Sequence, residues 1–405
     1  MEFRNIKSKF PIFKQKIKGK PLIYLDSANS SQKPKVVIDE ISRFYETEFS
    51  NVGRSVHTLA VKATNKFEET RDLMKSYINA KHREEIIFTK GATEAINLVA
   101  NTYGEKYINA GDEILITELE HHSNYVPWHY LRKKRGAVIK FASVNENGEI
   151  NVDEFKKQIT EKTKIIAFTH ISNVTGTVMP VKKIIDLAKS KNIPVLIDGT
   201  QGAPHSFLDV QDLGCDFYAI SCHKMYGPNG LGILYAKKNW VEKLPPYQGG
   251  GGMISEVKKD EITYADSPTK FEAGTMQTAE VVAFAKSIKF IQNLGIKNIE
   301  HHESDILEYG LEKLRKDNSI NIIGNPKNRA SIISFTIKGI HPHDIATILD
   351  DDGVAIRAGH HCCQILHDKL GIPASARASI GVYNNKEDID VLSESINKCK
   401  KVFQI

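Results

Sequence analysis

The sequence has few cysteines, no long apolar run and little excess of either charge. Five cysteines in 405 residues are too few, and odd in number, for a disulfide framework, which excludes a small disulfide-bonded secreted protein. No segment approaches the roughly 20 consecutive apolar residues of a membrane-spanning helix, so we expect no membrane partner. The 55 basic and 49 acidic residues leave a formal charge of +6, which is weak support for nucleic-acid binding. We therefore expect a globular protein of a reducing, cytoplasmic compartment.

The composition is that of an ordinary globular chain. Apolar residues make up 41% and charged residues 26%, and the length favours two or three domains. Repeats, proline-rich linkers and glycine–serine linkers are absent, and the glycines at 249–252 favour a mobile loop near a ligand. The first 20 residues hold seven Lys or Arg and one acid, a bias shared with transit peptides. Scarce serine and an early Pro11 instead favour a structural arm over residues 1–25, which we expect to pack on the small C-terminal domain.

Apolar runs typical of covered strands alternate with helical patterns through the first two-thirds of the chain. The expected strands are 85–89, 113–117, 138–142, 164–169, 194–198, 217–221 and 232–236. The expected helices are 93–107, 124–134, 152–159 and 181–191. This alternation predicts an α/β domain over residues 26–275, with a mostly parallel seven-stranded sheet between helices.

The pattern changes after residue 276, where a smaller α+β domain is expected to run to residue 405. Its expected helices are 279–294, 298–314, 342–350 and 386–403, and its expected strands are 331–337 and 354–357. A hairpin-like pair, formed by LPPYQGGGGM (residues 244–253) and the sequel to Tyr264, is expected between the two domains.

Three polar groups follow expected strands of the large domain. Gly91-Ala92-Thr93 opens a helix, where backbone N–H groups bind phosphate, although a plain N-cap turn has the same pattern. Asp198 ends one strand and Lys224 follows the next, so both can face one crevice. Pyridoxal 5′-phosphate (PLP) requires this pair, because its aldehyde takes a lysine and its ring nitrogen a carboxylate. Alone, a capping aspartate and a surface lysine remain the alternatives.

The segment Arg357-Ala-Gly-His360-His361-Cys362-Cys363 is rich in potential ligands and nucleophiles. Two His and two Cys invite a zinc site, but adjacent ligands are poorly spaced for one tetrahedral ion. A reactive thiol beside cationic groups is the better interpretation, with one cysteine packed inward.

Nine motifs along the chain resemble those of SufS-type (group II) cysteine desulfurases, in the class V aminotransferase family of fold-type I PLP enzymes. They occur in the family's order from near the N-terminus to near the C-terminus. They are YLDSANSSQKP, GATEAINL, ELEHHSNYVPW, HISNVTGT, LIDGTQGAPH, SCHKMYGPNGLGILY, FEAGT, RAGHHC and ARASIGVYN.

The resemblance implies a role for each cofactor residue. Lys224 should form the Schiff base with PLP, Asp198 should keep the ring nitrogen protonated, and Gln201 should bind the phenolic oxygen. His121 should stack on the ring and move protons. The phosphate should be held by residues from several motifs: Ala92, Thr93, Ser221, His223 and Thr275. Of these, Thr275 should come from a second subunit.

The resemblance also implies the reaction. Arg377 should bind the carboxylate of L-cysteine, with Asn173 and Arg357 as secondary contacts, and Cys362 should take the sulfur as a persulfide while L-alanine leaves. A homodimer, a SufE- or SufU-like acceptor and iron–sulfur scaffold proteins are the implied partners. A selenocysteine lyase or another PLP-dependent β-elimination enzyme is the alternative.

The chain departs from the family pattern at several positions. Gly53 stands where a histidine is frequent, and Met276-Gln277 replace Pro-Asn. Asn29 replaces a small residue, and Cys363 follows the nucleophile where relatives usually have a small residue such as alanine.

Overall fold

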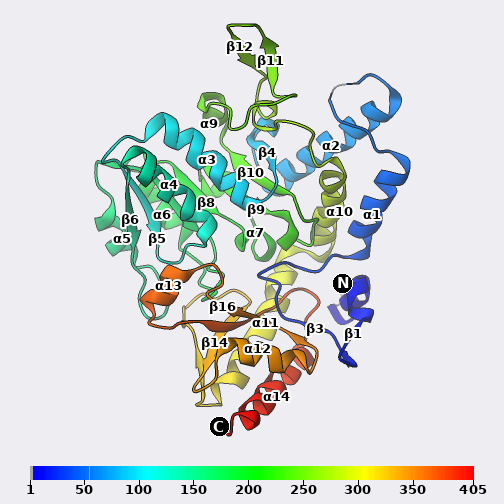
Figure 1. Cartoon of the computed structure of the whole chain (residues 1–405), viewed down its shortest axis with the longest axis vertical. Coiled ribbons are helices and arrows are strands. Elements are labelled where there is room, and N and C mark those ends of the chain that lie inside the picture. Colours follow the sequence, from blue (N-terminus) through cyan, green and yellow to red (C-terminus); the bar gives the residue numbers. More distant parts are fainter. Residues whose placement is uncertain (1–2, 54) are drawn as a thin grey trace.

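A computed structural model describes residues 3–53 and 55–405, and its largest element is a seven-stranded sheet (Figure 1). The strand order is β4-β10-β9-β8-β7-β5-β6; β10 is antiparallel to both neighbours and the other pairs are parallel. The strands are β4 (Ile86–Thr89), β5 (Glu113–Thr117), β6 (Val138–Ala142), β7 (Thr163–Thr169), β8 (Val195–Asp198), β9 (Phe217–Ser221) and β10 (Gly232–Ala236). Each matches a predicted strand within a residue or so, and the predicted fold class is confirmed.

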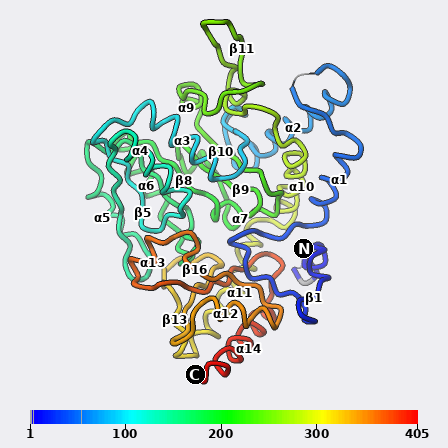
Figure 2. The backbone as a smooth tube through the Cα atoms, in the orientation of Figure 1, coloured from blue at the N-terminus to red at the C-terminus, as the bar shows by residue number. Residues whose placement is uncertain are grey.

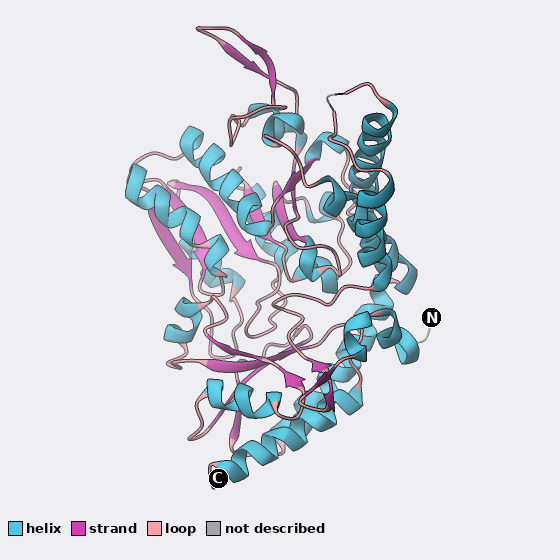
Figure 3. Ribbon diagram, turned by 45° about the vertical axis from the view of Figure 1, so that its right-hand side comes forward, coloured by secondary structure: helices cyan, strands magenta, loops and turns pink. Residues whose placement is uncertain are grey.

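Helices cover both faces of this sheet (Figure 3). They do so because the strands carry apolar side chains on both faces, and each apolar face must be buried. On β8, Leu196 packs on one side with helices α3 and α4, whereas Val195 and Ile197 pack on the other with α2, α6 and α10. The helices of this part are α1 (Lys35–Thr47), α2 (Thr58–Tyr77), α3 (Ala92–Tyr107), α4 (Val126–Arg135), α5 (Val152–Gln158), α6 (Val181–Lys189), α7 (Gly202–His205), α8 (Val210–Leu213), α9 (Lys238–Lys243) and α10 (Thr278–Leu294).

A second, four-stranded sheet of order β13-β14-β17-β16 lies below the first in Figure 1. Its strands are β13 (Ile320–Ile322), β14 (Ile332–Ile337), β16 (Arg357–Gly359) and β17 (Ser375–Ser379), and its helices are α11 (Ile296–Arg315), α12 (Pro342–Asp350), α13 (Gln364–Lys369) and α14 (Lys386–Val402). The strand predicted at 354–357 is divided: β15 (Val354–Ala355) pairs with β3 (Ile23–Tyr24), and β16 pairs with β17. Sequence reasoning missed β17 because the apolar positions of SARAS are alanines, Ala376 and Ala378, which are small and are not typical strand residues.

The N-terminal segment packs against residues next to the large sheet and against α14 next to the small sheet (Figure 2). Phe10 meets the rings of Tyr226 and Phe290 edge-on, and Lys7 forms an ion pair with Asp388 at 2.8 Å. The strands β1 (Lys16–Ile17) and β2 (Lys20–Pro21) form a short hairpin before β3. The predicted border at residue 276 stays a prediction; the packing of α10 against α1 and α2 favours a border after α10.

The strands β11 (Ile254–Val257) and β12 (Ile262–Tyr264) form an antiparallel hairpin that projects from the body (Figure 1). It occupies the place where the sequence predicts a hairpin-like pair. Among the described residues, no helix combines the length and the apolar character needed to cross a membrane.

Candidate active site

A cavity of about 230 Å³ opens at the carboxyl ends of β7, β8 and β9. Open α/β sheets bind their ligands at this edge. Eleven of the predicted site residues line the cavity: Ala92, Thr93, His121, Asn173, Asp198, Gln201, Ser221, His223, Lys224, Arg357 and Cys362. Arg377 and Thr275 are the two that do not.

Asp198 and Lys224 are held by neighbouring strands. Asp198 is the last residue of β8 and is 3% exposed, and its Oδ1 accepts the backbone N–H of Thr200 at 3.0 Å. Burial raises the pKa of Asp198, opposed by that hydrogen bond and by the charge of Lys224. Lys224 ends the short 3₁₀ helix η5 (Cys222–Lys224) directly after β9.

Burial is the main cause that lowers the pKa of Lys224 to about 8. The positive charges of Arg377 and Arg357 act in the same direction, and Asp198 opposes them. A larger neutral fraction near neutral pH makes this amine a better nucleophile towards a carbonyl. These pKa shifts are compatible with the roles predicted for the pair, which stay predictions.

His121 presents a neutral ring to the cavity. Its Nδ1 accepts the backbone N–H of Ser123 at 3.1 Å, so the ring proton of the neutral form is assigned to Nε2. Burial, followed by the charge of Lys224, lowers the pKa of His121 to about 3. An uncharged imidazole of fixed tautomer can stack on an aromatic ring and exchange a proton with a neighbouring group.

The start of α3 and the end of β9 form the polar end of the cavity. Ser221 Oγ accepts the Ala92 N–H at 3.1 Å, and Thr93 Oγ1 lies 2.8 Å from Ser123 Oγ. A Cβ atom on Gly232 of β10 would come within 2.4 Å of the Gly91 backbone, so a glycine is needed for this close approach. The amide groups of a helix N-terminus and these hydroxyls suit an anion such as phosphate.

His223 is held in place by the loop before α1. Its Nδ1 lies 3.1 Å from Ser30 Oγ, and its carbonyl accepts from Lys33 Nζ at 2.7 Å and from Ser31 Oγ at 3.0 Å. Burial lowers the pKa of His223 to about 4, and the charges of Lys224 and Lys33 add to this effect.

Cys362 lies on the loop between β16 and α13, and it is half-buried. His361 and Cys362 both adopt left-handed backbone conformations, with φ of 51° and 58°. Such conformations persist in non-glycine residues only where the surroundings hold them. The Cys362 carbonyl accepts the His122 N–H at 2.8 Å, and Arg357 Nη2 lies 3.5 Å from the Cys362 sulfur.

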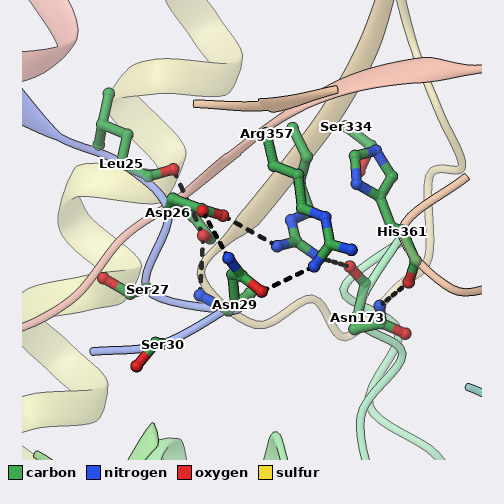
Figure 4. A network of polar contacts seen from close by, with 12 residues as sticks. Leu25, Asp26, Ser27, Asn29, Ser30, Asn173, Ser334, Arg357 and His361 are labelled. Carbon is green, nitrogen blue, oxygen red and sulfur yellow. Dashed lines mark hydrogen bonds and ion pairs between the residues drawn. The ribbon is translucent and has the colours of Figure 1, made fainter. Parts of the chain in front are cut away.

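Arg377 lies on β17 with no exposed side-chain surface. Its Nη2 contacts Asp26 Oδ1 at 3.1 Å and its Nη1 donates to the Asn173 carbonyl at 3.0 Å. These two partners, Asp26 and Asn173, are labelled in Figure 4. Its buried Nε has no partner within the described part of the chain. Burial lowers the pKa of Arg377, and the Asp26 carboxylate opposes this. The Nε–H of the guanidinium is thus available to a further acceptor.

The remaining predicted groups lie elsewhere. Thr275 is exposed and outside the cavity. The His–Cys segment does not converge on one point: His361 Nε2 contacts Ser375 Oγ at 3.0 Å, and Cys363 Sγ contacts Asn173 Oδ1 at 2.9 Å. No group of three or more potential metal ligands lies together among residues 3–53 and 55–405.

Sequence reasoning missed several residues around the cavity. Asp26 has an identifiable signal, since it is a carboxylate directly after the apolar run of β3, but its partner Arg377 lies 351 residues away. Ser123 donates its backbone N–H to His121 Nδ1, and Lys33 donates its side-chain amine to the His223 carbonyl. Nothing in a linear pattern marks such contacts.

The model of one protein family, described as aminotransferase class-V, matches residues 23–392. The chain belongs to the aminotransferase class-V family. A relative named probable cysteine desulfurase, from Halalkalibacterium halodurans, is 46% identical over 403 residues, which cover 100% of this chain and 99% of that protein. One of the same name from Staphylococcus epidermidis is 46% identical over 97% of this chain and 96% of its own length.

Solved structures agree with this assignment. The cysteine desulfurase CsdA of Escherichia coli matches with a TM-score of 0.92 at 33% identity, over 99% of both chains. A cysteine desulfurase of Thermococcus onnurineus matches with a TM-score of 0.94 at 33% identity, again over 99% of both chains. The predicted family is confirmed, and the expected activity agrees with the names of these full-length relatives.

Proposed function

We propose that this class-V family member is a PLP-dependent cysteine desulfurase, which converts L-cysteine to L-alanine and carries the sulfur as a persulfide on Cys362. The observation that carries this function is the single cavity lined by Lys224, Asp198 and Cys362. It combines an amine for the cofactor, a carboxylate for the cofactor ring and a nucleophilic sulfur.

The residues of the cavity fit PLP. Gln201 Nε2 donates to the Ala28 carbonyl at 2.7 Å, while its buried Oε1 has no partner in the part of the chain that the structure describes. A buried amide oxygen without a partner is costly, so a polar ring substituent beside it would satisfy the site. Ala92, Thr93, Ser221 and His223 lie together at the end where a phosphate would be held.

PLP, when bound, supplies an electron sink that makes the Cα–H and Cβ–S bonds of an amino acid easier to break. Lys224 holds the cofactor and then moves the proton at the substrate Cα. Asp198, buried at the end of β8, would stabilise the protonated ring nitrogen of the cofactor. His121, with a neutral imidazole facing the same cavity, would stack on the cofactor ring and hold a proton for these transfers.

Arg377 is proposed to orient the substrate carboxylate through its unpartnered Nε, with Arg357 and Asn173 beside it. Arg357 Nη2 also lies 3.5 Å from the Cys362 sulfur, the atom proposed to react with the substrate. The thiolate sulfur forms a bond to the substrate sulfur while the Cβ–S bond breaks. The carbon fragment is then protonated and leaves as L-alanine, and Cys362 keeps the sulfur.

The second subunit, the sulfur acceptor and the cytoplasmic location are also proposals. Exposed apolar side chains lie on α1 and α2 and between them, and they suit the surface of a second copy: Val36, Ile38, Tyr45, Phe49, Leu59 and Val61. In a homodimer, the exposed Thr275 would reach the phosphate of the other subunit. A SufE- or SufU-like protein would accept the sulfur from Cys362 for iron–sulfur cluster assembly in the cytoplasm.

One experiment tests the proposal directly. The purified protein is assayed for bound PLP and for L-alanine formed from L-cysteine, and the persulfide is alkylated and located by mass spectrometry. We expect one PLP per chain, a persulfide on Cys362, and loss of desulfuration but not of PLP in Cys362→Ala. L-Alanine formation from L-cysteine that survives Cys362→Ala would contradict the persulfide mechanism, pyruvate formed in place of L-alanine would favour the β-elimination alternative, and protein that cannot bind PLP would contradict the proposal altogether.

A further inference from the structure

Cys363 is buried directly behind the cavity wall, next to the proposed nucleophile. Its side chain has no exposed surface, and burial raises its pKa, so the thiol keeps its proton. The Sγ lies 2.9 Å from Asn173 Oδ1 and 3.8 Å from the Leu119 carbonyl. A protonated thiol can donate to one such oxygen at a time, and the Asn173 amide oxygen is the nearer of the two.

The Asn173 amide is held from both ends. Its oxygen faces the Cys363 thiol, and its Nδ2 donates to the His361 carbonyl at 2.8 Å. Turning the amide over would place its oxygen against the His361 carbonyl, so two acceptors would face each other. The Cys363 thiol and the His361 carbonyl therefore fix the same amide orientation, and the thiol holds the Asn173 oxygen while its nitrogen donates to His361.

The His361 carbonyl belongs to the strained part of the nucleophile loop (Figure 4). His361 and Cys362 are the two residues of this loop with left-handed φ values, 51° and 58°. A backbone of this kind relaxes when its contacts are lost. The contact from Asn173 thus helps to fix the direction in which Cys362 faces the cavity.

We propose that Cys363 is a positioning residue for Cys362, acting through the amide of Asn173 on the backbone of the nucleophile loop. The chain of contacts runs from the Cys363 thiol to Asn173, then to the His361 carbonyl, and ends at Cys362. This inference rests on the proposed role of Cys362 as the sulfur acceptor. It requires no chemistry at Cys363 itself.

Two variants of the holoenzyme test the inference. Cys363→Ala removes the donor, whereas Cys363→Ser keeps a hydroxyl donor in nearly the same volume. Cys399→Ala, which removes another fully buried thiol on α14, is the matched control. For each protein we measure the alkylation rate of Cys362 without substrate, by mass spectrometry, and the rate of L-alanine formation in a single turnover.

We expect Cys363→Ala to alkylate about five-fold faster at Cys362 and to form L-alanine about five-fold more slowly, the effect of one lost hydrogen bond. Cys363→Ser and Cys399→Ala should both match the unmodified protein in these two rates. Equal rates in all four proteins, or equal defects in Cys363→Ala and Cys363→Ser, would overturn the inference.

The same data separate this inference from the proposed function. If the unmodified protein forms its persulfide on Cys363, both the nucleophile assignment and the positioning role are wrong. If the persulfide forms on Cys362 and the Cys363 variants behave alike, only the positioning role is wrong.

Discussion

The cofactor side and the nucleophile side of the cavity differ in how the chain holds their side chains. On the cofactor side, Asp198 and Ser221 are the last residues of two buried strands in the centre of the large sheet. On the nucleophile side, Cys362 lies on a loop with left-handed residues, and its backbone is held by the His122 N–H.

The difference has a physical consequence. Asp198 is paired with strands on both sides, β7 and β9, so it moves only if hydrogen bonds to both neighbours are broken. A loop residue is released when one or two contacts, each worth about 1 kcal/mol, are lost. This suits the proposed chemistry, because the cofactor must stay in place while the sulfur on Cys362 must meet both the substrate and an acceptor protein.

The largest effect is expected on the cofactor side, from Lys224→Ala. Loss of the amine removes both cofactor attachment and proton transfer, so L-alanine formation should fall by a factor of about 10²–10⁴ or more. The absorption band of a lysine–PLP Schiff base should also be lost. Lys182→Ala, at an exposed position, is the control and should keep both signals. A Lys224→Ala protein of near-normal activity would remove the basis of the comparison.

A substitution of Arg377 tests whether a residue on a strand of the nucleophile side is as important for activity as the strand-end residues of the cofactor side. Arg377→Lys keeps the charge but loses the planar fork of N–H donors. We expect kcat/KM for L-cysteine to fall about 10- to 100-fold, mainly through KM, because hydrogen bonds between charged groups are lost. Arg83→Lys, at an exposed position, should leave KM unchanged. An unchanged KM in Arg377→Lys would place the substrate carboxylate elsewhere.

Gly232→Ala tests how tightly the cofactor side is packed. The added Cβ would lie 2.4 Å from the Gly91 backbone, so β10 and the start of α3 would have to separate. We expect a loss of about 1–3 kcal/mol in unfolding free energy, measured in urea, and faster dissociation of PLP. Gly91→Ala is the matched control, since its Cβ would meet nothing within 4 Å in the described structure. Equal unfolding free energies of the two variants would show that β10 and the start of α3 separate at little cost.

The sequence predicts the cofactor side better than the nucleophile side, for a physical reason. Asp198 and Lys224 follow apolar runs, and strand ends of a parallel sheet meet at one edge, so their proximity follows from local patterns. The ion pair of Arg377 with Asp26 joins residues on two elements far apart in sequence. The missed β17 and the divided strand at 354–357 have the same origin, because partners in the small sheet are set by tertiary contacts.

The last prediction again concerns Lys224, and it concerns the unfolding free energy of the PLP-free protein. The folded state lowers the pKa of Lys224 to about 8 from 10.5, chiefly by burial. Below pH 8 the lysine is protonated in both states, and the folded protein bears the full cost of a buried charge. Between these two pKa values the unfolded chain still binds the proton and the folded chain does not, so stability rises with pH.

Lys224→Met removes this cost. We expect the PLP-free variant to be more stable than the unmodified protein at pH 7, by at most about 3 kcal/mol, and the difference to vanish near the pKa of the unfolded lysine. Urea unfolding at several pH values from 7 to about 10 measures it. Lys182→Met, at an exposed site, should show no such convergence. A stability difference that stays constant with pH would mean that burial does not lower the pKa of Lys224. The cofactor side of the cavity would then be more open to water than the nucleophile side.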